Sequence, residues 1–236
     1  MTHLKHLVAS AVLALVGAQA HAVALNFDFG DLKWDGSRNT GFLPTSSSYK
    51  CTNGDLCSSD VNNNRYGGGL TYTQQDVSLT ATGSYRGHAA AVVQDHDNSY
   101  TPGGKNGAGL GVYHTKYTSD DNVTFGEVLT LTFNQDVTIS NVGLRSETHD
   151  VWNWTKGATL LVNGKEMLLP KGTGDLGVNL TGRTFTFAFN DRCGDQFYLS
   201  SLAVQAVPEP ASAAMLLAGL GLVGGIARRR RQPRGA

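Results

Sequence analysis

An apolar/polar alternation with a period of two residues runs through most of this 236-residue chain and limits what it can fold into. In LTLTFNQDVTI, the side chains of Leu129, Leu131 and Phe133 alternate with polar ones. LNFDF, from Leu25, and TFTFAF, from Thr184, repeat the pattern. Because successive side chains of a strand point to opposite faces, we expect half-buried β-strands here.

The segments between these strands carry the signals of turns and bulges. Asn163-Gly164 lies between two apolar runs, a strong signal for a two-residue β-hairpin turn. The alternation changes phase near Asn141 and again at Ser200-Ser201, which predicts bulges or turns. Residues 36–69 are less regular and are expected to form long loops. No part of residues 23–206 shows a convincing helical stripe, so we predict an antiparallel, jelly-roll-like β-sandwich.

The charge of the chain is unevenly distributed. The formal net charge is zero, yet residues 23–207 hold 13 Lys and Arg against 18 Asp and Glu, a net charge of −5. Five arginines fall within the last nine residues. A mildly acidic middle argues against nucleic-acid binding, which needs a clustered basic surface.

The first 22 residues have the pattern of a secretory signal peptide. Lys5 precedes the apolar run of residues 7–18, and Ala20 and Ala22 then offer an A-x-A site for signal peptidase. The run is too short for a membrane anchor. Residues 23–206 are therefore expected to form one exported domain.

All three cysteines lie in the part predicted to be exported, where oxidising conditions favour disulfides. Cys51 and Cys57 enclose a short polar loop, so we expect them to pair with each other. Pairing of Cys193 with either of them is the alternative, and one thiol is left over in every case.

A second apolar segment lies near the end of the chain. Ala211–Ala227 is 17 residues without a charge, at the lower limit for a transmembrane helix. The cluster Arg228, Arg229, Arg230 and Arg231 follows at once and is expected to stay in the cytoplasm with the short tail 232–236. The preceding domain would then face outward.

Pro208-Glu209-Pro210 stands directly before this span, and its prolines keep the strip extended. The order of Pro-Glu-Pro, apolar span and arginine cluster over residues 207–231 resembles the PEP-CTERM sorting signal of Gram-negative bacteria. That resemblance implies that Pro208, Glu209 and Pro210 are recognised by an exosortase, a membrane-embedded processing enzyme. It also implies an inner-membrane intermediate with a periplasmic ectodomain, followed by delivery to the cell surface or beyond, in association with exopolysaccharide and biofilm. Residues 109–207 resemble, more loosely, ectodomains of such proteins.

Two groups of residues are candidates for ligand binding. Asp120, Asp121 and Glu127 flank the start of a predicted strand and Asp195 opens the last one, so these carboxylates can hold a structural Ca²⁺. A solvated acidic turn is the simpler interpretation.

Trp152 and Trp154 are two residues apart and would point the same way on a strand. Exposed, they can stack on a sugar ring; buried, they belong to the core.

The motifs of common enzymes are absent from the sequence. There is no G-x-S-x-G and no H-E-x-x-H, and the group His88, Asp95, His96 and Asp97 has no recognised ligand spacing. We therefore expect a non-catalytic exported protein of the cell surface or extracellular matrix. The alternative is a carbohydrate-binding β-sandwich, steadied by Ca²⁺.

Overall fold

The fold was analysed in a computed structural model, which describes residues 23–46, 49–51, 56–59, 69–95, 107–114, 121–151, 154–155, 157–189 and 195–207, with a few positions from 217 to 224. Residues Ala24–Ala206 form one compact unit. Its described residues are folded as β-strands, turns and bends, which confirms the all-β class.

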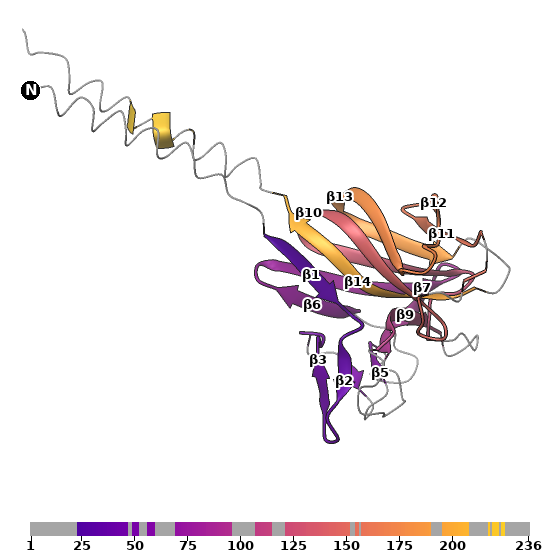
Figure 1. The fold of residues 1–236 in the computed structure, drawn as a ribbon. Coiled ribbons are helices and arrows are strands. Elements are labelled where there is room, and N and C mark those ends of the chain that lie inside the picture. Colours follow the sequence, from indigo (N-terminus) through magenta and orange to yellow (C-terminus); the bar gives the residue numbers. More distant parts are fainter. Residues whose placement is uncertain are drawn as a thin grey trace, which may run out of the picture. The chain divides into compact units, whose positions relative to one another are not determined.

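Fourteen strands are formed by the described residues. They are β1 (Ala24–Asp28), β2 (Leu32–Trp34), β3 (Asn39–Gly41), β4 (Lys50–Cys51), β5 (Leu56–Ser58), β6 (Leu70–Gln74), β7 (Val77–Tyr85), β8 (His88–Asp95), β9 (Gly109–Tyr113), β10 (Glu127–Ser146), β11 (Thr159–Val162), β12 (Lys165–Leu168), β13 (Asp175–Phe189) and β14 (Phe197–Ala206) (Figure 1).

Twelve of the described strands belong to one sheet, and β2 and β3 form a separate hairpin. Within the sheet, β7, β8, β9, β14 and β10 pair in a closed circuit. The long strand β10 makes the closure possible, because Glu127–Phe133 pairs with β7 and Val137–Ser146 pairs with β14. Instead of the two facing sheets expected of a jelly-roll sandwich, the described strands therefore form a closed five-stranded core extended by neighbouring strands.

The predicted strand faces are confirmed. Leu129, Leu131 and Phe133 on β10 are buried, whereas Thr130 and Thr132 between them are not. The phenylalanines of β13 and the apolar residues that follow Ala24 are buried in the same way. Burial of each such side chain contributes about 1.5–3 kcal/mol, so the alternation itself selects the face that turns inward.

The predicted turn and bulges are confirmed as well. β11 and β12 pair through Val162 and Lys165, and the two residues between them, Asn163 and Gly164, have φ of 52° and 74°. This left-handed conformation at both positions is what a type I′ turn requires. The β10–β14 register shifts at Ile139/Asn141 and again opposite Ser200, where the sequence alternation also changed phase.

The region predicted as long loops contains more structure than expected. Besides the β2–β3 hairpin, β4 and β5 pair with Cys51 directly opposite Cys57, and the two cysteines form a disulfide, as predicted. In the β2–β3 turn, the backbone N–H groups of Arg38 and Ser37 donate to Asp35 and hold its pKa at about 2. Cys193 lies outside the described residues.

The predicted transmembrane span at 211–227 lies largely outside the described residues. The described positions 217, 219–221, 223 and 224 are helical. In the part of the chain that the structure describes, no helix has the length and apolar character needed to cross a membrane.

Candidate functional site

The boundary between the folded unit and the C-terminal segment is sharply defined. β14 pairs with β1 on one side and β10 on the other until its end, where Gln205 lies opposite Ala24 and Ala206 opposite Val137. Val207 no longer belongs to a strand. The pairing of β14 with β1 and β10 is thus complete before the Pro-Glu-Pro sequence begins.

Several residues predicted from sequence fall outside the described part of the chain. They are the recognition residues Pro208, Glu209 and Pro210, the arginines Arg228, Arg229, Arg230 and Arg231, the signal-peptidase residues Ala20 and Ala22, and the ligand candidates Asp120 and Trp152.

The three described carboxylates of the predicted calcium site have separate hydrogen-bond partners. Asp121 Oδ1 accepts from the Tyr198 hydroxyl at 2.6 Å, and Glu127 Oε2 accepts from the backbone N–H of Thr124 at 2.9 Å. Both oxygens of Asp195 accept from Thr155, through its backbone N–H and its hydroxyl. Among the described residues, no group of three or more His, Cys, Asp or Glu side chains is arranged to hold a metal ion. Calcium binding stays a prediction.

Trp154 is a member of the hydrophobic core. Its side chain is only 8% exposed and packs within the main cluster of buried residues. An indole in this position has no free face on which a sugar ring can stack. Of the two alternatives for the tryptophan pair, core or sugar platform, Trp154 therefore belongs to the core.

A buried acid–base pair, which the sequence did not predict, joins two distant parts of the chain. His149 Nε2 lies 2.9 Å from Asp95 Oδ2, at the end of β8, and both side chains are largely buried. His149 has a φ of 63°, which is unusual for a residue with a side chain. The sequence had grouped Asp95 with His88, but His88 is exposed at the other end of β8.

Neighbouring side chains fix this pair in place. The His149 ring packs edge-on against Tyr198, with ring centroids 5.3 Å apart. Arg145 donates through Nη1 to the His149 carbonyl at 3.0 Å and through Nε to the Ser200 hydroxyl at 3.2 Å. The contacts fasten the turn after β10 to β8 and β14.

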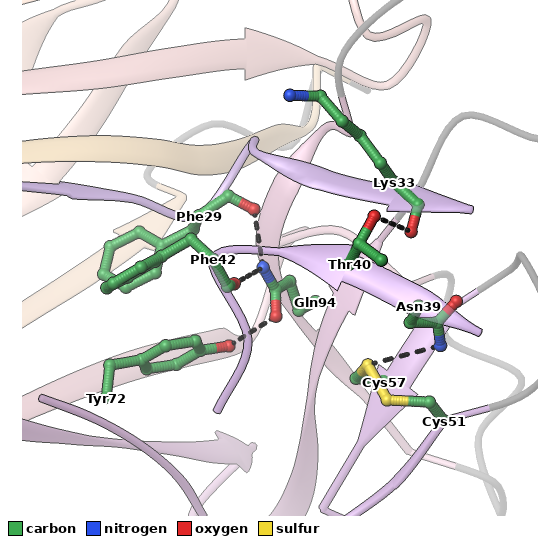
Figure 2. Close-up of a disulfide and its surroundings, with 9 residues drawn as sticks. All are labelled: Phe29, Lys33, Asn39, Thr40, Phe42, Cys51, Cys57, Tyr72 and Gln94. Carbon is green, nitrogen blue, oxygen red and sulfur yellow. Dashed lines mark hydrogen bonds between the residues drawn. A yellow bond between two sulfur atoms is a disulfide. The ribbon is translucent and has the colours of Figure 1, made fainter. Parts of the chain in front are cut away.

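A second buried polar group lies beside the disulfide (Figure 2). Gln94 on β8 is fully buried and donates through Nε2 to the carbonyls of Phe29 and Phe42, at 2.9 and 2.8 Å. Its Oε1 accepts from the Tyr72 hydroxyl at 3.0 Å. Burial raises the pKa of Tyr72 well above its ordinary value, so this hydroxyl stays a donor.

A surface groove of about 500 Å³ lies between β13 and the β11–β12 hairpin. Its lining combines apolar side chains, such as Val162, Met167 and Leu180, with polar ones, such as Asn163 and Lys165. None of its lining residues is aromatic.

Comparison with known proteins identifies the C-terminal segment. Residues 206–231 match the PEP-CTERM protein-sorting motif. No curated protein and no solved structure matches the chain. The match covers the segment that directly follows the end of β14, and it includes the Pro-Glu-Pro sequence and the arginine cluster on which the predicted resemblance was based.

Proposed function

Because this chain carries a PEP-CTERM protein-sorting motif at residues 206–231, we propose that it is an exported protein processed by an exosortase. The β-domain would then be delivered to the cell surface or the extracellular matrix. It acts there without catalysing a reaction, in or beside exopolysaccharide, as a component of the biofilm.

The position of the motif is the observation that carries this proposal. The motif begins at residue 206, where the last strand ends with its pairings to β1 and β10 complete. Cleavage near Pro208–Pro210 would therefore remove nothing that the sheet needs, and a folded domain would be released. During sorting, the segment 211–227 would hold the protein in the inner membrane, with Arg228–Arg231 in the cytoplasm.

The disulfide supports an exported location, since such bonds persist in oxidising compartments. The non-catalytic role in this proposal is the expectation drawn from the sequence, which has no G-x-S-x-G and no H-E-x-x-H motif.

The test is delivery of a motif variant in the native host. In the triple variant Pro208→Ala, Glu209→Ala, Pro210→Ala, we expect the protein to accumulate in the membrane fraction and to be depleted from the cell surface and medium. Pro233→Ala, beyond the arginine cluster, is the matched control and should be delivered normally. Normal delivery of the triple variant would contradict the proposal.

A further inference from the structure

Threonines occupy the outward positions of four adjacent strands, β6, β7, β10 and β13, in register with one another. Thr71 lies opposite Thr80, Thr80 opposite Thr132, and Thr132 opposite Thr184. One row of hydroxyls thus crosses all four strands. Each of these strands contains the sequence Thr-x-Thr, and pairing brings the four copies side by side.

A second row runs beside the first. In it, Thr82 lies opposite Thr130 and Thr130 opposite Thr186. On the other side of the first row, Thr73 of β6 lies opposite Ser78 of β7. We call the eight threonines of the four Thr-x-Thr sequences the threonine grid: Thr71, Thr73, Thr80, Thr82, Thr130, Thr132, Thr184 and Thr186. All eight are exposed or half-buried, whereas the residues that alternate with them belong to the core.

The hydroxyls of the grid are partly fixed before any ligand arrives. Thr71 and Thr80 hydrogen-bond through their Oγ1 atoms at 2.9 Å, and Thr73 bonds Thr45 in the same way at 3.2 Å. A β-branched side chain also has few χ1 rotamers to lose. Each hydroxyl offers one donor and two acceptor sites, so a bonded pair still has capacity for a partner.

The chemistry of the grid excludes most classes of partner. Its eight positions carry no positive charge, so they lack the cationic groups that dominate binding to nucleic acids and acidic polymers. They also carry no aromatic or large aliphatic side chain of the kind that anchors a protein interface. Closely spaced, uncharged donors and acceptors are complementary to a ligand that is itself uncharged and rich in hydroxyls.

The twist of the sheet favours a flexible, linear ligand over a rigid, flat one. The strands that carry a row are spaced about 4.8 Å apart. Adjacent strands are rotated by roughly 20–25°, so four strands do not present a flat lattice. A chain polymer can follow one twisted row from β6 to β13, which a rigid surface cannot do.

We propose that the threonine grid is a binding surface for an extended, uncharged polysaccharide. This deepens the proposed function, since it names the partner class of a protein that acts beside exopolysaccharide. It also moves the sugar contact away from Trp154, which is buried in the core.

Affinity electrophoresis of the protein purified from its host tests the proposal. The native gels contain dextran, hydroxyethylcellulose or galactomannan as uncharged polymers, or alginate as an anionic one. We expect retardation by at least one uncharged polymer, unchanged by added salt, and none by alginate.

The variant Thr80→Val, Thr132→Val keeps the shape of the row and removes two hydroxyls. We expect it to bind about tenfold more weakly. The matched control is Thr138→Val, Thr181→Val, which removes another cross-strand hydroxyl pair of β10 and β13 outside the grid. It should bind like the wild type. The variant Thr130→Val, Thr186→Val tests the second row independently should the first variant fold poorly.

The proposal would be overturned if the grid variants and the control variant were retarded equally. It would also be overturned if none of the uncharged polymers retarded the wild type. Delivery to the cell surface, measured on the same variants, separates this result from the proposed function. A protein that is sorted normally but binds no polysaccharide would refute the grid alone.

Discussion

Gln94 is the residue on which the packing beneath the disulfide depends. Its amide satisfies two backbone carbonyls and one buried hydroxyl, from β6 and from the two chain segments that flank the β2–β3 hairpin (Figure 2). A buried polar group that loses its partner costs about 1–3 kcal/mol, so the three bonds act as a set.

For Gln94→Leu, we expect a loss of about 3–5 kcal/mol in unfolding free energy, because three buried groups are left without a partner. Tyr72→Phe, which removes one hydroxyl from the same network, should cost only about 1 kcal/mol. Urea unfolding of both variants gives the comparison. Equal losses would show that the amide is not the centre of the network.

Asp28 makes stability depend on pH. Burial, with the nearby Asp31 carboxylate, raises the pKa of Asp28 above its ordinary value. A group with a higher pKa in the folded protein binds more protons when folded, so stability falls as pH rises from the unfolded to the folded pKa. That loss persists at neutral pH.

Asp28→Asn should therefore increase the unfolding free energy at neutral pH. At about pH 3, where the carboxyl is mostly protonated in both states, the variant and the wild type should unfold alike. Urea unfolding at the two pH values measures this. A variant that is less stable than the wild type at neutral pH would contradict the assignment.

Among the elements, those specified by local sequence were predicted well. The faces of β1, β10 and β13 follow from alternation alone, and Asn163-Gly164 specifies its turn because both positions need a positive φ. The bulges at Ser140 and Ser200 were visible because an extra residue reverses the alternation.

Contacts between distant elements were not predictable in this way. His149, in the turn after β10, meets Asp95 only because β8, β9, β14 and β10 pair in their observed register. The threonine grid likewise exists only where four Thr-x-Thr sequences are aligned by pairing. Alternation marks these threonines as outward-facing but gives no register between strands.

The β4–β5 element depends on its disulfide, since its strands have only two and three residues. In Cys51→Ser, Cys57→Ser, we expect a loss of about 2 kcal/mol, the value for closing a short loop in the unfolded chain. Comparing oxidised wild type with the variant by thermal unfolding tests this. An unchanged Tm would show that β5 is held by its pairing with β8 alone.

In the folded unit as a whole, closure of the sheet is the feature that the sequence did not indicate. Alternating strands are equally compatible with two facing sheets and with a closed circuit. The choice is made by β10, whose two halves pair with β7 and β14 on either side of the register shift between Thr132 and Val137. Neither the composition nor the periodicity of the sequence indicates that β10 changes its pairing strand from β7 to β14.

Since β14 completes its pairings at Ala206, a chain that ends after Val207 should fold like the full one. We expect its unfolding free energy to lie within about 0.5 kcal/mol of the full-length value, as for changes outside the core. Denaturant unfolding of both exported forms makes the comparison. A destabilisation well beyond that range would mean that the domain needs its C-terminal segment.

The intact mass of the mature protein shows whether the C-terminal segment is a sorting signal. The protein is purified from its native host with and without the exosortase. We expect a chain that ends near Val207–Pro210 when the enzyme is present, and one that keeps Arg228–Ala236 when it is absent. A mature protein that retains Arg228–Ala236 in both strains would contradict this expectation.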